Sequence, residues 1–168
     1  MIKETADYIF SFLCHQRPER SWEIAGYVLP LCARCTGVWA GAFLCSVNLF
    51  FARFRPLKTI LWIHGIFILQ MIVFGFNLIV HPQWVRTLSG FVFAAGVVYF
   101  MWLPVRSAWF DSRKTKKMSY FLFIAAHCAV IQILLQIQYA FIYNIIVVFC
   151  IAGLFCVIMI TACNSVLF

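Results

Sequence analysis

Charged residues are scarce in this chain, and acidic residues are the scarcest. Of its 168 residues only 11% are charged, whereas 65% are hydrophobic. A soluble globular domain is apolar over about half of its sequence, so this composition excludes an ordinary soluble fold. All five acidic residues lie outside the long apolar runs. This argues against an ion-coupled transporter, which commonly depends on buried carboxylates.

Several familiar motifs are also missing. We find no glycine-rich nucleotide-binding loop and no haem-attachment Cys-x-x-Cys-His. The start does not resemble a cleavable signal peptide, because Lys3 is followed by Glu4 and Asp7 and the apolar run 8–13 is short. We therefore expect the apolar spans themselves to direct the chain to the membrane.

Five apolar stretches can form membrane-spanning helices, each of which needs roughly 20 apolar residues. Three cover residues 36–54, 59–80 and 88–105, and the run from residue 118 to the end holds two more, with a turn near 136–144. Residues 4–14 form a shorter amphipathic segment, expected along the membrane surface. The sequence thus predicts an all-α polytopic membrane bundle of about five transmembrane helices plus a short N-terminal interfacial helix.

We expect one membrane domain over residues 1–168. Residues 1–35 would form the interfacial helix and a motif loop, and residues 36–168 the transmembrane bundle. The Gly37-x-x-x-Gly41 pattern is interpreted as close helix packing within that bundle. His64 and His127 are interpreted mainly as interhelical hydrogen-bonding groups, with an ion or proton path as the alternative. The oligomeric state is not determined by the sequence.

Basic residues gather in two of the four linkers. The linkers after the first and third spans carry eight Lys and Arg residues, whereas the other two carry only Arg86. Because basic loops stay in the cytoplasm, we expect a multi-pass protein of the cell membrane with both basic linkers cytoplasmic. The formal charge of +8 then reflects topology and contacts with the lipid bilayer, and not nucleic-acid binding. The N-terminal segment would be extracytoplasmic, where disulfides can persist.

Cysteine and histidine are concentrated before the first span. Cys14-His15 is followed, after a charged loop, by the Cys-Ala-Arg-Cys sequence of Cys32 and Cys35. These two cysteines would share one face at the start of a helix. With Cys14 and His15 they complete the Cys₃His donor set of many zinc sites. His15 can join the same ion only if the chain bends at residues 16–18; otherwise it is an acid/base group beside three thiolates.

Three arginines surround these donors, namely Arg17, Arg20 and Arg34. They would offset the negative charge of a zinc ion held by three thiolates. They would equally lower thiol pKa values, which favours redox chemistry, or hold a phosphate or carboxylate. We take His15, Glu23, Arg20 and Arg34 as candidate catalytic residues, with the two side chains His15 and Glu23 as proton-transfer groups.

Two segments of the chain resemble a known family. Residues 14–21 and 29–37 read CHQRPERS and LPLCARCTG. They resemble the prokaryotic membrane family called domain of unknown function 2085. The resemblance implies a small multi-span membrane protein and leaves its reaction open. By that resemblance the signature positions are Cys14, His15, Arg20, Cys32, Arg34, Cys35 and Gly37.

Three functions fit these residues. The leading hypothesis is a zinc site at the extracytoplasmic membrane interface, serving an enzyme that acts on a lipid or other anionic membrane substrate. The second is a membrane thiol-disulfide oxidoreductase that uses Cys32 and Cys35, with Cys14 as the resolving thiol. The third is a non-catalytic membrane component in which a structural zinc or a disulfide pins the N-terminal helix to the first span.

Overall fold

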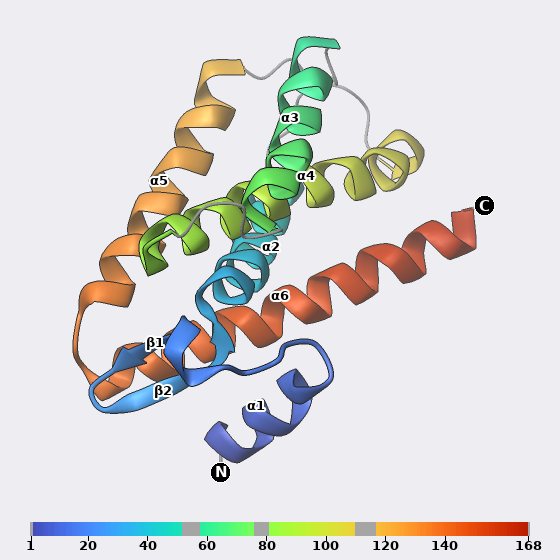
Figure 1. Cartoon of the computed structure of the whole chain (residues 1–168). Coiled ribbons are helices and arrows are strands. Elements are labelled where there is room, and N and C mark those ends of the chain that lie inside the picture. Colours follow the sequence, from blue (N-terminus) through green and yellow to red (C-terminus); the bar gives the residue numbers. More distant parts are fainter. Residues whose placement is uncertain (1, 52–57, 76–80, 110–116, 168) are drawn as a thin grey trace.

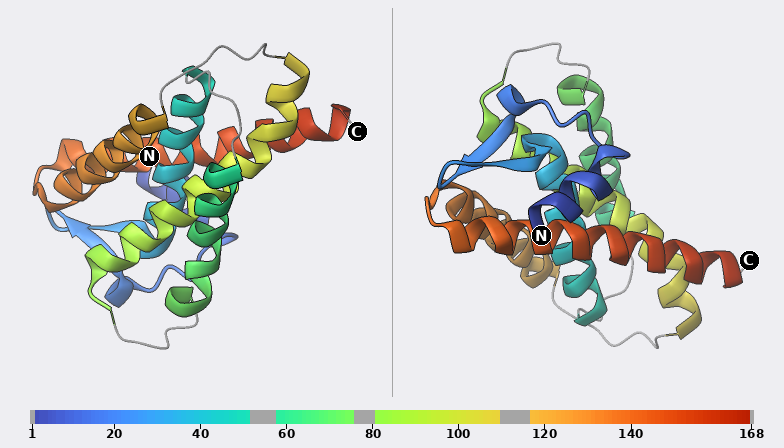
Figure 2. Two further views of the ribbon diagram at one scale, coloured as in Figure 1. Left: turned by 90° about the horizontal axis from the view of Figure 1, so that it is seen from above. Right: turned by 90° about the horizontal axis from the view of Figure 1, so that it is seen from below.

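The chain folds as a helical bundle with a small β-hairpin at one end. The computed structural model describes residues 2–51, 58–75, 81–109 and 117–167. Its elements are α1 (Ile2–Ser11), the 3-10 turn η1 (Pro18–Arg20), β1 (Ser21–Ile24), β2 (Tyr27–Cys32), α2 (Ala33–Phe51), α3 (Lys58–Gly75), α4 (Gln83–Trp109), α5 (Lys117–Gln136) and α6 (Ala140–Leu167). The helix α2 lies in the middle, and α1 and the hairpin lie together at one end (Figures 1 and 2).

The helices α2 to α6 occupy the five stretches that the apolar pattern predicts, and α1 is the predicted N-terminal helix. Among the described residues, Gln83–Trp102 of α4 and Ala140–Val166 of α6 are long and apolar enough to cross a membrane. Leu61–Ile72 of α3 and Phe121–Gln136 of α5 are shorter apolar segments. The helices are therefore where they were expected, while a membrane crossing by all five stays a prediction.

The prediction of an all-α chain is wrong in the motif segment. The strands β1 and β2 form a two-stranded antiparallel sheet. Its turn is Ala25-Gly26, and both residues have positive φ, 52° and 79°, as the type I′ turn of tight hairpins requires. The pairing shifts between Ser21 and Glu23. Pro30 lies in the irregular part of β2, where its missing N–H breaks no regular ladder.

The backbones of α2 and α4 touch through glycines. A Cβ on Gly37 of α2 would overlap the carbonyl oxygen of Thr87, and a Cβ on Gly90 of α4 would overlap that of Arg34. At Gly41 a Cβ would lie 3.1 Å from the nearest backbone atom of α4. The interpretation of Gly37-x-x-x-Gly41 as packing within the bundle is confirmed, because small residues allow such close helix approach.

Helix α6 makes the same kind of close backbone contact on another side of α2. A Cβ on Gly153 would overlap the carbonyl oxygen of Trp39. Nearer the hairpin, the Cys150 thiol donates to the carbonyl oxygen of Thr36 over 3.8 Å. The position of α2, and with it the start of that helix, is thus fixed between α4 and α6.

Polar side chains tie the helices together. The Gln70 amide of α3 donates to the Ser89 carbonyl of α4 at 2.8 Å, and the Gln132 amide of α5 donates to the Trp84 carbonyl at 3.0 Å. Both bonds join different helices, as intramembrane polar groups commonly do. They place α3 and α5 against α4.

The two histidines that were interpreted as interhelical hydrogen-bonding groups, His64 and His127, differ in their surroundings. The Nδ1 atom of His127 lies 2.7 Å from the Phe123 carbonyl of its own helix, so this contact joins no second helix. His64 is fully buried and stacks on Tyr99 of α4, with ring centroids 4.0 Å apart. The packing of His64 against an aromatic ring supports its structural interpretation over an ion path.

Some predictions fall on residues outside the described ranges. These include most of the two basic linkers, at 52–57 and 110–116, and the end of the second predicted span, at 76–80. The predicted orientation in the membrane therefore stays a prediction.

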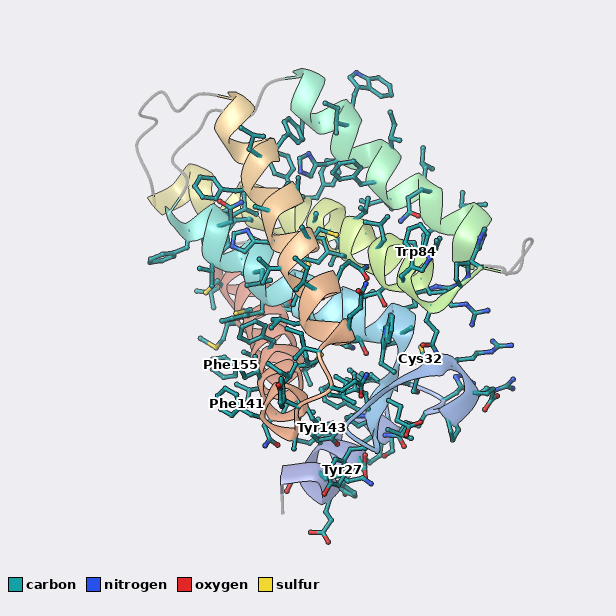
Figure 3. All side chains as sticks on the ribbon, turned by 90° about the vertical axis from the view of Figure 1, so that its left-hand side faces the viewer. Tyr27, Cys32, Trp84, Phe141, Tyr143 and Phe155 are labelled. Carbon is teal, nitrogen blue, oxygen red and sulfur yellow. The ribbon has the colours of Figure 1, made fainter. Side chains whose placement is uncertain are left out.

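The outer face of α6 is apolar and exposed. Phe141 and Phe155 are 71% and 62% exposed and project away from the bundle (Figure 3). On the hairpin side of the same helix, Tyr143 is buried and its ring lies 5.7 Å from that of Tyr27. Exposed aromatic rings on a helix of mean hydropathy 3.0 suit a lipid environment.

The close contact of α2 with α4 predicts the effect of one added methyl group. Gly90→Ala should destabilise the protein by about 1–3 kcal/mol, because the helices must separate to admit the Cβ. Gly65→Ala is the control, since a Cβ at that helical position meets no atom within 4 Å. The control should be neutral or more stable by about 0.5–1 kcal/mol. Thermal unfolding in detergent measures both, and equal stability of the two variants would contradict the packing.

Candidate metal centre

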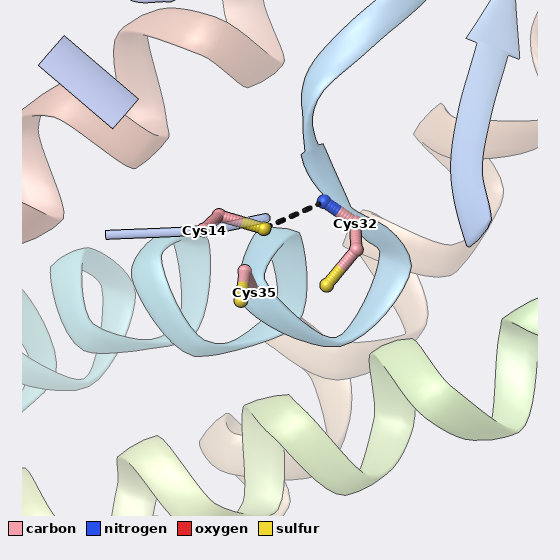
Figure 4. Close-up of side chains that lie close together, drawn as sticks. All are labelled: Cys14, Cys32 and Cys35. Atoms are coloured by element: carbon pink, nitrogen blue, oxygen red, sulfur yellow. Dashed lines mark hydrogen bonds between the residues drawn. The ribbon is translucent and has the colours of Figure 1, made fainter. Parts of the chain in front are cut away.

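Three cysteine sulfur atoms meet at the junction of α1, the hairpin and α2. The Sγ atoms of Cys14, Cys32 and Cys35 all lie within 4.8 Å of one another (Figure 4). A zinc ion with Zn–S bonds of about 2.3 Å in tetrahedral geometry would hold sulfurs about 3.8 Å apart. Three thiols gathered within 4.8 Å are a donor set that suits a thiophilic metal.

Cys14 is positioned by the end of α1. The backbone N–H groups of Leu13 and Cys14 both donate to the Phe10 carbonyl, at 3.0 and 2.9 Å. The chain then turns at Gln16, whose φ is 47°, and the Gln16 side chain donates to the Asp7 carbonyl at 2.8 Å. The bend predicted at residues 16–18 is therefore present, and it directs Cys14 toward the hairpin.

Cys32 and Cys35 come together at a strand-to-helix junction. Cys32 ends β2 and Cys35 lies in the first turn of α2, so the prediction that both lie on a helix is corrected for Cys32. The Thr36 hydroxyl donates to the carbonyls of Leu31 and Cys32, at 3.4 and 3.2 Å, and so fixes the junction. The Cys32 N–H donates to the Cys14 sulfur at 3.4 Å, which is a bond typical of metal-ligating thiolates.

Two side chains of α4 and β1 hold the hairpin on the bundle. The Trp22 indole N–H donates to the Thr87 hydroxyl at 2.8 Å, and the Gln83 amide donates to the Ser21 carbonyl at 3.1 Å. Sequence reasoning did not identify these residues. Their partners are 65 and 62 residues away in the chain, beyond the reach of local patterns.

The turn between α5 and α6 holds the hairpin from another side. The Gln138 side chain accepts from the Ala25 N–H at 2.8 Å and donates to the Glu23 carbonyl at 3.3 Å. The side-chain amide of Gln138 thus forms hydrogen bonds with two backbone groups at the tip of the hairpin. Gln138 was expected in a turn, but nothing in its neighbours indicated this partner.

A cavity of about 380 Å³ opens over the cysteines, within the size range of small-molecule sites. It brings together six of the seven predicted site residues. Glu23, on an exposed part of β1, is not among the described residues that line it, so a catalytic role for Glu23 stays a prediction. The lining consists of Leu13, Cys14, His15, Gln16, Arg17, Arg20, Cys32, Arg34 and Cys35.

The cluster stabilises a thiolate at Cys14. Hydrogen bonds from the Cys32 and Cys35 thiols hold the pKa of Cys14 far below its usual range. The same interaction with Cys14 raises the pKa of Cys32. The N-terminus of α2 adds a favourable field, because helix N-termini stabilise nearby negative charge. The pKa of Cys35 is raised in the same way as that of Cys32, so without a metal the cluster favours one thiolate, at Cys14, beside two neutral thiols.

His15 lies apart from the three sulfurs. It is exposed and lines the cavity, whereas the group of donors within 4.8 Å, among the described residues, consists of the three cysteines. The backbone bend at Gln16 therefore gathers Cys14 but not the adjacent imidazole into the cluster. This arrangement favours the second of the two predicted roles, a proton-transfer group beside the centre.

Residues 14–100, which contain the whole cluster and just over half of the chain, match the family described as predicted membrane protein (DUF2085). The chain belongs to the DUF2085 family. The match confirms the resemblance seen in the cysteine motifs and agrees with the apolar helices of the bundle.

Two curated relatives are similar to this DUF2085 chain over a short segment. An uncharacterized protein of Methanothermobacter thermautotrophicus is 47% identical over 34 residues, which are 20% of this chain and 31% of the relative. An uncharacterized protein of Methanocaldococcus jannaschii is 42% identical over 36 residues, 21% of this chain and 23% of the relative. The chain thus matches less than a third of either relative's length. No solved structure matches the chain significantly.

Removal of the Gln138 side chain should loosen the hairpin. In Gln138→Ala the amide of Ala25 loses its acceptor and the Glu23 carbonyl loses a donor, at a cost of about 0.5–1.5 kcal/mol for each bond. Hydrogen–deuterium exchange of the hairpin amides should become faster. Gln136→Ala, two positions earlier at the exposed end of α5, is the matched control and should exchange like the natural protein. Unchanged protection in Gln138→Ala would show that the hairpin does not depend on this contact.

Proposed function

We propose that Cys14, Cys32 and Cys35 hold a zinc ion at the extracytoplasmic membrane interface, in an enzyme that acts on a lipid or other anionic membrane substrate. The observation that carries this proposal is the meeting of three sulfurs at the wall of a cavity lined by three arginines. A purely structural staple needs the sulfurs but does not need the cationic cavity.

Zinc is the metal that the donors suit best. Thiolates are soft ligands that select zinc, Cu(I) or iron–sulfur clusters, and three protein ligands with one open position are typical of catalytic zinc. Three thiolates around Zn²⁺ carry a net charge of about −1, which is costly near lipid. The guanidinium groups of Arg17, Arg20 and Arg34 in the same cavity offset that charge.

The residues of the cavity would have different roles in such an enzyme. When bound, zinc with an open position supplies Lewis-acid activation of a water molecule. His15 lines the cavity and would take up or deliver a proton there. The arginines hold the anionic group of the substrate through charge-assisted hydrogen bonds and so orient it toward the sulfurs.

The directions in which the helices run support a position of the cysteines at the membrane interface. The hairpin is bonded to the start of α4 and to the α5–α6 turn, so the cysteines lie at the end of the bundle where α2, α4 and α6 begin. The two basic linkers follow the opposite ends of α2 and α4 in the sequence. If those linkers are cytoplasmic, as their cations predict, the cysteines face outward.

Zinc content tests the centre directly. Protein purified anaerobically in detergent should contain one zinc ion per chain by mass spectrometry, and Cys35→Ser should lose it. Cys163→Ser, which changes an exposed cysteine of α6, is the matched control and should keep its zinc. Metal retained in full by Cys35→Ser would refute the centre.

The role of His15 has a separate test. Because the imidazole lies outside the group of three sulfurs, His15→Ala should keep its zinc and show the same three-sulfur X-ray absorption spectrum as the natural protein. If His15 is the fourth ligand, the spectrum of the natural protein will contain an imidazole signal that the variant lacks.

A thiol-disulfide oxidoreductase is the second candidate, favoured by the short distances among three free thiols. Cys32 and Cys35 would then form the exchanging disulfide, with Cys14 as the third thiol. Metal-free protein whose Cys32–Cys35 disulfide forms and is reduced reversibly would support this candidate. Thiols that stay reduced under oxidising conditions, in a protein that contains zinc, would exclude it.

A further inference from the structure

The cavity over the cysteines has a lining rich in positively charged side chains. Three arginine side chains and His15 line it, and the described residues of the lining include no Asp or Glu. We propose that this cavity binds a phosphate monoester, carried by a phospholipid such as phosphatidic acid. The inference rests on the proposed function, because it names the anionic substrate of the same site.

Charge selects a phosphate over other anions. A zinc centre of three thiolates contributes about −1 and the three arginines contribute +3, so the lining of the loaded cavity has a formal charge of about +2. A phosphate monoester carries about −1.5 to −2 at neutral pH, whereas a carboxylate carries at most −1. The phosphate therefore matches the charge of the loaded cavity more closely.

The number of hydrogen-bond donors at the cavity also favours a phosphate over a carboxylate. A guanidinium group presents five N–H donors in a rigid fork that fits two oxygens of a phosphate. Arg17 and Arg20 at one cavity can share the several oxygens of a phosphate, whereas a carboxylate offers only two. The first turn of α2, which supplies Arg34 and Cys35 to the lining, adds backbone N–H groups of a kind that bind phosphates at helix N-termini.

The surroundings of the cavity favour a lipid as the carrier of the phosphate. Leu13, in the lining, is 43% exposed, and the neighbouring Phe12 and Tyr8 are 74% and 69% exposed. Phe12 and Tyr8 pack edge to face, with centroids 5.4 Å apart, while Ala6 and Phe10 on the other side of α1 are fully buried. An amphipathic helix with exposed aromatics lies at the level of lipid headgroups. It would hold the cavity beside the phosphates of the bilayer.

Calorimetric titration of the zinc-loaded full chain tests the inference, in a maltoside detergent that contains no phosphate. The probes are dihexanoyl phosphatidic acid, inorganic phosphate, and dihexanoyl glycerol as the phosphate-free analogue. The phosphatidic acid should bind and the glycerol analogue should not. Inorganic phosphate that binds as tightly as the lipid would support phosphate recognition but assign the site to a soluble phosphate ester.

Two variants and a control locate the binding. Arg20→Gln and Arg17→Gln should each weaken the binding of phosphatidic acid by about tenfold or more, because each variant loses a charge-assisted hydrogen bond to the phosphate. Lys3→Gln removes the same charge from an exposed position of α1 and should bind like the natural protein. Equal binding of the lipid and its phosphate-free analogue, or undiminished binding in both arginine variants, would overturn the inference.

Zinc analysis of each sample separates this inference from the proposed function. Arginine-dependent binding of phosphatidic acid in a protein that takes up no zinc would reject the metal centre and keep the phosphate site. Stoichiometric zinc with no binding of either phosphate probe would reject the phosphate site and keep the metal centre. Zinc retained by Arg20→Gln and Arg17→Gln also verifies that these variants are folded around the cysteines.

Discussion

Direct backbone contact between α2 and α4 is the constraint on which the rest of the structure depends. Gly37 follows Cys35 by two residues, and its partner on α4 is the carbonyl of Thr87. The hydroxyl of the same Thr87 accepts from Trp22 of the hairpin. One helix contact therefore fixes both the cysteine at the start of α2 and the strand that faces it. Any side chain at Gly37 would move these two parts of the site apart.

The Cys-Ala-Arg-Cys-Thr-Gly motif combines chemistry and packing in consecutive residues. Its two cysteines supply sulfur donors and Arg34 supplies charge to the cavity. Thr36 closes the strand-to-helix junction through its hydroxyl, and Gly37 allows α4 to approach. The threonine and glycine carry no reactive group, yet the spacing of the sulfurs depends on both.

The sequence predicts the parts of this fold that depend on composition. Long apolar runs predict helices, because a backbone in lipid must satisfy its own hydrogen bonds, and α2 to α6 lie at these runs. Soft donors near Arg34 predict the candidate metal centre. The hairpin was missed because β1 has only four residues and because Ala25 seldom adopts positive φ. Cys32 was assigned to a helix because its spacing from Cys35 fits a helix turn as well as a strand-to-helix junction.

The bonds from Gln138 to the hairpin have a consequence for biosynthesis. They join residues 113 and 115 positions apart, so the tip of the hairpin cannot be anchored until the ribosome has made the chain beyond Gln138. Contacts so distant in the chain form late, after the cost of closing a long loop. The three cysteines lie within residues 14–35 and therefore leave the ribosome much earlier, as free thiols. The hairpin beside the cysteines is therefore held at its tip only after more than a hundred further residues have been made.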